Sequence, residues 1–231
     1  MFKIHTAQNA LNRLQTSREE LANSLSHGLG LLAILFGTPF LILHAIHSEH
    51  TGYIIGVCIF TASMILLYLG STLYHATPNG RLKDAFQIID HSMIFLLIAG
   101  TYTPFTLGVL TGGWGWSIFG ITWGLAALGI SLKIFGGAMN RPIFDNILYL
   151  VMGWIIVIAI EPLINNLSST GMFWLVTGGI SYSLGMVFYL TDSRVNYGHF
   201  LWHLFVLGGS ISHFFAVWYA SPVYVIPSVQ G

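Results

Sequence analysis

Residues 52–75 read GYIIGVCIFTASMILLYLGSTLYH and contain no Asp, Glu, Lys or Arg. A helix needs about 20 mostly apolar residues to cross the hydrocarbon core of a bilayer, so this run predicts a transmembrane helix. Six other runs have a similar length and composition. Together they predict seven spans, at residues 22–46, 52–75, 86–110, 114–136, 143–165, 171–191 and 199–220.

The composition of the whole chain also indicates a lipid environment. Of its 231 residues, 55% are hydrophobic and 7% are charged, whereas roughly 25% of the residues of a soluble domain are charged. Eight basic residues balance eight acidic ones, which argues against nucleic acid as a partner and leaves membrane lipids as the expected partners. The single cysteine, Cys58, lies inside a predicted span. A disulfide framework and a cysteine-based metal site are therefore excluded.

The connections between the runs are short and rich in turn-forming residues, as in residues 77–80 and 111–113. Helices joined in this way run antiparallel and pack as one bundle. We therefore predict an all-α integral membrane protein, with a seven-helix transmembrane domain over residues 22–220.

The basic residues predict the orientation of this bundle. All eight precede the first span, or lie at the end of an even-numbered span or in the connection after it: Lys3, Arg13, Arg18, Arg81, Lys83, Lys133, Arg141 and Arg194. Basic connections are retained on the cytoplasmic side of a membrane. Residues 1–21 are therefore expected in the cytoplasm and the tail, residues 221–231, outside. The expected location is the cell (plasma) membrane, specifically a bacterial inner membrane.

Ionisable residues inside the predicted spans are candidates for function, because they are costly to keep in a membrane. His75 ends the second span, Asp90 lies near the start of the third, and the seventh begins with His199 and His203. All four thus lie at the cytoplasmic end of the bundle. Residues four apart share a helix face, so His199 and His203 can bind one ion together. His75 would complete the three-histidine set that zinc uses when one coordination position stays open for water.

Two neighbours of the histidines are predicted to act in catalysis. Asp90 is placed to hold a metal-bound water or to orient a ligand. Ser71 lies one turn before His75 on the same face and can hydrogen-bond the same water or a substrate. An alternative interpretation pairs Asp90 with Arg81 or Lys83 at the membrane interface.

Other polar residues also have structural interpretations. Residues 17–20 fit the S-x-x-E capping box that begins a helix, and Asn23 can form a hydrogen bond within its own helix. His91 points about 100° away from the residue before it. His213 lies about 15 Å deeper than the second histidine of its span, where it is either a buried hydrogen-bonding residue or part of a deeper pocket.

Several polar motifs occur in a characteristic order along the spans. They are Glu20-x-x-Asn23-x-x-x-His27, Ser71-x-x-x-His75, Asp90-His91-Ser92, Thr101-Tyr102-Thr103-Pro104, and His199-x-x-x-His203 with His213 downstream. Together they resemble the hemolysin III branch of the progestin and adipoQ receptor family. The resemblance extends from Glu19 to Trp218 and implies a seven-helix fold with a cytoplasmic N-terminus, in agreement with the basic residues.

The resemblance also implies a metal and an activity. It implies Zn²⁺ bound by His75, His199 and His203, with Asp90 in contact with the metal-bound water. The supporting polar residues that it implies are Glu20, Asn23 and His27. The adiponectin receptor branch and the related alkaline ceramidases imply hydrolysis of a lipid amide. The chain departs from those receptors in its shorter N-terminal region and its shorter connection from His75 to Asp90. It also has Glu161 near a position where bacterial relatives often have Lys. Because of these departures, the function of the receptors is not assigned to this chain.

Three functions are compatible with these observations. The first is a zinc-dependent hydrolase of a membrane lipid, acting in membrane lipid homeostasis. The second is a pore-forming cytolysin, which the sequence disfavours because it shows no secretion signal and no amphipathic pore strand. The third is a sensor or receptor of lipid state without catalysis, for which the short cytoplasmic segments offer little interface area. The sequence favours a zinc protein and leaves catalysis open.

Overall fold

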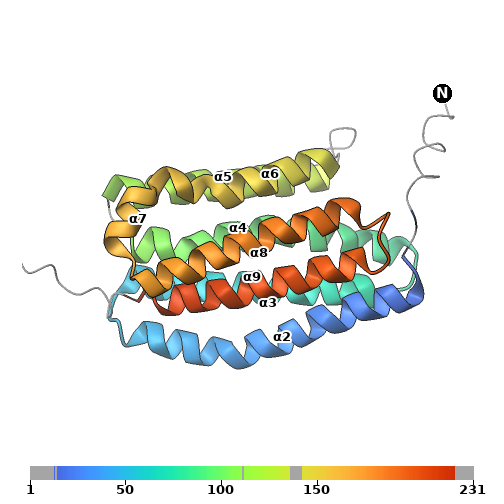
Figure 1. Cartoon of the computed structure of the whole chain (residues 1–231), viewed down its shortest axis with the longest axis horizontal. Coiled ribbons are helices and arrows are strands. Elements are labelled where there is room, and N and C mark those ends of the chain that lie inside the picture. The colour runs from blue at the N-terminus through green and yellow to red at the C-terminus, as the bar shows by residue number, and fades with distance from the viewer. Residues whose placement is uncertain (1–12, 14, 111, 136–141, 222–231) are drawn as a thin grey trace, which may run out of the picture.

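The computed structural model describes residues 13, 15–110, 112–135 and 142–221, and the regular structure in this part of the chain is helical (Figure 1). Seven helices in it are long and apolar enough to cross a membrane, which confirms the predicted number. Six of them are continuous: α2 (Ser17–Ile46), α3 (Thr51–Ala76), α4 (Arg81–Gly108), α5 (Gly112–Phe135), α8 (Ser169–Thr191) and α9 (Gly198–Trp218).

The fifth span is interrupted. It consists of α6 (Pro142–Trp154), a 3₁₀ segment (Ile155–Ala159) and α7 (Ile160–Asn166). Pro162 lacks a backbone N–H, and its ring would clash with the carbonyl four residues earlier in a regular helix. That carbonyl belongs to Ile158, inside the 3₁₀ segment. The hydroxyl of Tyr102 stabilises the break, since it donates to the Met152 carbonyl at 2.7 Å and accepts from the Ile156 N–H at 3.1 Å.

Two helices begin well before their apolar runs, whereas the others begin within two residues of theirs. α2 begins at Ser17 and α4 at Arg81, each five residues before the predicted start. At the start of α2, the Thr16 side chain accepts from the Glu19 N–H, and the Glu19 carboxylate accepts from the Thr16 N–H. The predicted capping box at residues 17–20 is therefore wrong by one residue, because both Thr16 and Ser17 stand three residues before a glutamate.

The order of the helices in space brings the histidines together. α5 and α6 lie along one side of the bundle and α2 lies along the opposite side (Figure 1). α2 packs against both α3 and α9, α3 packs against α4, and α8 packs against α9. The α3–α4 contact needs a glycine, since a Cβ at Gly56 would lie 2.6 Å from the Cα of Pro104. The last turn of α3 and the first turns of α9 consequently reach the same end of the bundle.

Candidate metal centre

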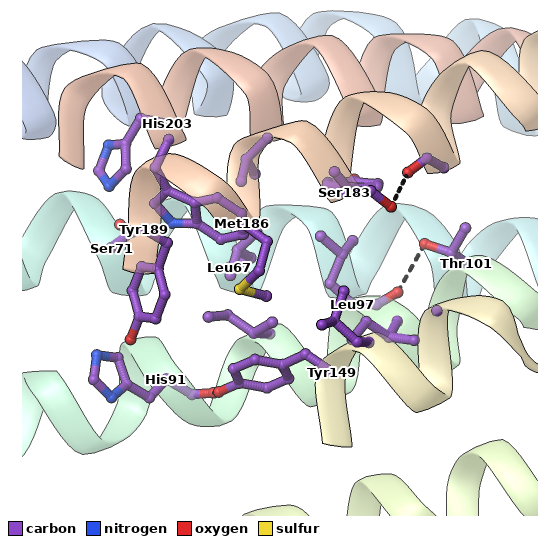
Figure 2. Close-up of a pocket in the computed structure, with 18 of the residues that line it drawn as sticks. Leu67, Ser71, His91, Leu97, Thr101, Tyr149, Ser183, Met186, Tyr189 and His203 are labelled. Carbon is purple, nitrogen blue, oxygen red and sulfur yellow. Dashed lines mark hydrogen bonds between the residues drawn. The ribbon is translucent and has the colours of Figure 1, made fainter. Parts of the chain in front are cut away.

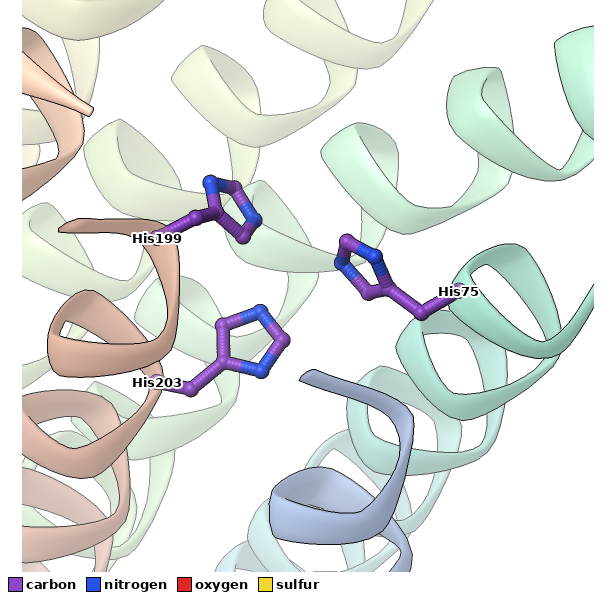
Figure 3. A group of neighbouring side chains, drawn as sticks. All are labelled: His75, His199 and His203. Atoms are coloured by element: carbon purple, nitrogen blue, oxygen red, sulfur yellow. The ribbon is translucent and has the colours of Figure 1, made fainter. Parts of the chain in front are cut away.

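Three histidine rings converge at that end of the bundle (Figure 3). His75 comes from the last turn of α3, and His199 and His203 come from the first two turns of α9. One nitrogen from each ring lies within 4.8 Å of the other two, and in the described residues no other group of three His, Cys, Asp or Glu has this geometry. Zinc bound at about 2.1 Å by three nitrogens would need them about 3.4 Å apart. Small side-chain rotations would therefore close the set around an ion.

Each of these rings is held through its Nδ1 atom by an oxygen from another part of the chain. The pairs are His75 with Glu20 Oε2 (2.7 Å), His199 with Asp192 Oδ2 (2.9 Å) and His203 with the Asn23 carbonyl (3.1 Å). Carboxylate and carbonyl oxygens can only accept hydrogen bonds. Each Nδ1 must therefore carry the ring proton, and each Nε2 keeps its lone pair. This arrangement is typical of metal-ligating histidines. Among the described residues the buried Nε2 of His75 has no hydrogen-bond partner.

Glu20 links the metal centre to α4. Its second oxygen, Oε1, pairs with the ammonium of Lys83 at 2.9 Å. Lys83 also donates to the carbonyls of Tyr74 and Thr77, at the C-terminal end of α3. In the part of the chain that the structure describes, neither Lys83 nor Arg81 forms an ion pair with Asp90. The alternative interpretation of Asp90 as an interface ion pair is therefore wrong.

Asn23 and His27, the other two supporting residues, both contact His203. The Asn23 carbonyl binds the His203 ring, while the Asn23 side chain donates to Gln15 at 2.6 Å. The His27 ring stacks on the His203 ring, with 3.6 Å between centroids and 7° between planes. The ring of Tyr68 also contacts the His27 ring, in an edge-on arrangement. His27 thus contributes a packing surface that limits the rotation of His203.

We expect Glu20→Gln to weaken zinc binding by about 10–100-fold, the usual effect of losing the carboxylate behind a histidine ligand. The amide keeps the size of the side chain but loses the charge that both His75 and Lys83 contact. Competition with a chromophoric chelator would measure the affinity of the purified protein. Glu161→Gln makes the same change at an exposed residue of α7 and should leave the affinity unchanged. Equal affinities for the two variants would contradict the assigned role of Glu20.

The structure adds two acidic residues that the sequence analysis did not single out. Asp192 orients His199 from the connection between α8 and α9. Glu19 holds this connection: it receives two hydrogen bonds from Arg13, at 2.6 and 2.7 Å, and a third from the Tyr197 N–H at 2.8 Å. Hydrogen bonding to Glu19 raises the pKa of Arg13. Tyr197 has a left-handed backbone (φ 57°), a strained conformation for this residue type that Glu19 stabilises. Neither Asp192 nor Glu19 stands at a helical spacing from the histidines that would have identified it from the sequence.

A cavity extends from the candidate metal centre into the bundle (Figure 2). Its lining includes His199 and His203, together with both predicted catalytic residues, Ser71 and Asp90. Ser71 and Asp90 are buried, and the Ser71 hydroxyl lies next to the Asp90 carboxylate. Farther from the histidines the walls are mainly apolar, with side chains such as Leu67, Leu97 and Met186. Among the residues that the structure describes, no Lys or Arg lines the cavity.

Three histidines outside the metal set also border this cavity: His27, described above, His91 and His213. His91 lies on its α4 wall. His213 lies deeper along α9, where its Nε2 donates to the Leu175 carbonyl at 3.2 Å and its ring packs against Gly178 of α8. His213 is therefore a buried hydrogen-bonding residue and also borders a deeper pocket, so both interpretations of its position apply. Glu161 lies exposed on α7 and does not line the cavity.

Comparison with known proteins gives a consistent result over nearly the whole chain. A family model described as "Haemolysin-III related" matches residues 15–214. The chain is 45% identical over 202 residues to the "Hemolysin-3 homolog" of Bacillus subtilis (strain 168), covering 87% of this chain and 94% of the relative. It is 43% identical over 217 residues to "Hemolysin-3" of Bacillus cereus, covering 94% and 96%. The human "Monocyte to macrophage differentiation factor" is 26% identical over 233 residues, covering 96% and 93%.

Proposed function

Because the chain belongs to the haemolysin-III related family and its buried histidines can hold a metal ion, we propose that it is a zinc-dependent hydrolase of a membrane lipid amide. Membership of the family confirms the resemblance inferred from the motifs. The observation that carries the proposal is the set of three imidazoles, each oriented through Nδ1 by an oxygen. Such a set leaves three Nε2 lone pairs for one ion beside a mainly apolar cavity. The cellular role that follows is membrane lipid homeostasis.

Zinc is the metal that fits this ligand set best. Three neutral imidazoles with one open position form a common catalytic zinc site, and a water bound there becomes acidic enough to supply hydroxide near neutral pH. Amide hydrolysis needs such a nucleophile because the amide carbonyl is a weak electrophile. Other divalent metals that accept imidazole would be less suited to this redox-neutral reaction.

Asp90 and Ser71 supply the remaining groups for hydrolysis. A carboxylate oxygen of Asp90 would accept the proton of the attacking water and then deliver it to the amide nitrogen as the C–N bond breaks. The products are a fatty acid, which gains the oxygen of the water, and an amine. The Ser71 hydroxyl, which faces the same cavity, would donate a hydrogen bond to the substrate carbonyl oxygen. The apolar walls would hold the acyl chain and exclude bulk water.

We expect Asp90→Asn to lower the turnover of a lipid amide by about 10²–10⁴-fold while the zinc content stays at the wild-type level. The amide keeps the shape of the side chain but cannot accept the proton of the water. Release of fatty acid from a panel of N-acyl lipids would measure turnover, and elemental analysis would measure zinc. Metal-free wild-type protein, or wild-type protein with bound zinc and no turnover of any lipid amide, would defeat the proposed function.

We further propose that the metal centre lies on the cytoplasmic side of a plasma membrane. The described basic residues gather at this end of the bundle: Arg13, Arg18, Arg81, Lys83, Lys133 and Arg194. Basic residues are retained on the cytoplasmic side. A reporter that matures only in the cytoplasm should be active when fused to the N-terminus and inactive when fused to the C-terminus. Activity at the C-terminus alone would reverse the assignment.

The names of the two Bacillus relatives support a second candidate, cytolysis. If the protein forms pores, purified wild-type protein should lyse erythrocytes, and the lysis should survive removal of the histidines. If the metal centre carries the function, lysis should be absent or should disappear together with the metal. A haemolysis assay of the wild type beside the variant His199→Ala/His203→Ala separates the two functions.

A further inference from the structure

The cavity at the metal centre adjoins a second pocket that shares part of its lining, and a histidine lies where the two meet. Leu67 and Met186 follow His203 along the wall of the first cavity (Figure 2). His213 lies about 15 Å beyond His203 along α9 and borders both spaces. The second pocket is lined mainly by apolar side chains of α4, the interrupted fifth span and α8. A polar ring therefore separates two apolar stretches.

The hydrogen bonds of His213 leave one ring nitrogen unused. Its Nε2 lies 3.2 Å from the Leu175 carbonyl. Because a carbonyl oxygen can only accept, Nε2 carries the ring proton and Nδ1 keeps a lone pair. The residue is only 7% exposed, and among the described residues its Nδ1 has no hydrogen-bond partner. A buried acceptor without a partner costs free energy, so this position favours a ligand that supplies a hydrogen-bond donor.

Contacts with α8 hold the ring in this orientation. A Cβ on Gly178 would lie 2.3 Å from the ring Cδ2, so the ring lies directly on the α8 backbone. The ring of Tyr182 lies 5.3 Å away, centroid to centroid, and its hydroxyl is paired with Ser210 at 2.8 Å. A rotation of the His213 ring would break its bond to Leu175. The Nδ1 acceptor is therefore positioned before a ligand binds.

The charges near the cavity lie at its other end. Lys133 does not line the cavity, but its charge acts on Asp90 and His91, near the metal centre. No charged side chain of the described residues acts on His213. A charged ligand group would lose its hydration there without gaining an ion pair. The donor that fits His213 is therefore uncharged, and a hydroxyl is such a group.

We propose that His213 forms a subsite for a hydroxyl on the acyl chain of the substrate, at a carbon beyond the middle of the chain. The inference rests on the proposed function for the lipid amide as the ligand. With the amide at the metal centre, the first apolar stretch holds the near part of the chain and the second pocket holds its end. One leaflet contributes about 15 Å of hydrocarbon, so a common acyl chain is long enough to reach this specificity-determining residue.

The test compares three methylamides of the same unsaturated fatty chain. N-Methyl oleamide has no hydroxyl, N-methyl ricinoleamide has one on its twelfth carbon, and the third lipid has one on its sixth carbon, where it would face apolar walls. Equilibrium binding of the tritiated lipids would be measured in nanodiscs and corrected for partition into empty nanodiscs. The Asp90→Asn protein is used because its slow turnover preserves the lipids. We expect the ricinoleamide to bind about tenfold more tightly than the other two, the effect of one or two net hydrogen bonds.

Variants in the same background assign that preference to His213. His213→Leu keeps an apolar side chain but removes the acceptor, so it should reduce the preference to less than threefold, with the affinity for N-methyl oleamide and the zinc content unchanged. Ser183→Ala is the matched control, because Ser183 lines the same cavity and its hydroxyl already donates to the Gly179 carbonyl at 2.8 Å. This control should keep the tenfold preference.

Equal binding of the three lipids, binding of none, or an equal gain from the hydroxyl on the sixth carbon would overturn the subsite, and these comparisons do not depend on the folding of His213→Leu. A preference that survives in His213→Leu, or that both variants lose, would also overturn it. Release of fatty acid by the wild type is measured separately. Selective binding without release would support the subsite and defeat the hydrolase, whereas release without selective binding would do the reverse.

Discussion

Replacing both His199 and His203 with alanine should reduce the zinc content of the purified protein from about one ion per chain to less than a tenth. Zinc needs three protein ligands to stay bound in a site with an open position, and the variant keeps only His75. Elemental analysis after dialysis against a weak chelator would measure the loss. A bound ion also stabilises the folded state, so a strong chelator should lower the melting temperature of the wild type and leave that of the variant unchanged.

His47→Ala is the matched control for this experiment. His47 is exposed near the opposite end of α2, where its Nδ1 binds the Leu43 carbonyl of its own helix. The control should keep its zinc and its response to the chelator. The candidate metal centre would be excluded if the double variant retained a full complement of zinc, or if both variants lost the metal to the same extent.

The second large effect concerns a buried ion pair that joins α5 to α6. Lys133 Nζ lies 2.6 Å from Asp145 Oδ2, and each residue is only 8% exposed. Removing one partner leaves a buried charge, which typically costs about 3–5 kcal/mol. We therefore expect Lys133→Met to destabilise the protein by about this amount, with an unfolding curve in a denaturing detergent as the measurement.

The double variant Lys133→Met/Asp145→Leu tests the reason for that loss. Because it removes both charges and keeps apolar volume, it should recover most of the stability that the single variant loses. Arg194→Met is the control, since Arg194 is basic and exposed at the same end of the bundle. A double variant no more stable than Lys133→Met would show that the ion pair is not the source of the effect.

The number of spans could be predicted because hydropathy reports the lipid-facing apolar runs directly. The starts of α2 and α4 could not, because their first turns are polar. Glu20 of α2 and Lys83 of α4 lie in those turns and pair with each other. A hydropathy scale treats each of these charges as unfavourable for membrane insertion, although the two side chains form an ion pair in the folded protein. The interruption after Trp154 was foreseeable only in part: Pro162 predicts a disturbance, but the supporting Tyr102 lies two helices away.

The convergence of the three histidines was predictable from the depth of each within its span. The groups that orient them were less accessible to sequence reasoning. Glu20 could be identified through a motif but was also assigned to a capping box that Thr16 and Glu19 form instead. Asp192 lies in the connection between α8 and α9, and the conformation of a connection cannot be predicted from residue periodicity. That these histidines bind zinc is inferred from ligand chemistry and stays a prediction, which elemental analysis would test.

The hydrogen bond between the Asn23 carbonyl and the His203 ring has a consequence for mutational studies. A backbone oxygen is present whichever side chain stands at position 23, so systematic alanine replacement leaves the acceptor in place. A scan of that kind would record only the loss of the amide contact with Gln15 and would underestimate how much α2 contributes to the geometry of α9. Exchanging the peptide bond for an ester that weakens this acceptor would expose the contribution directly.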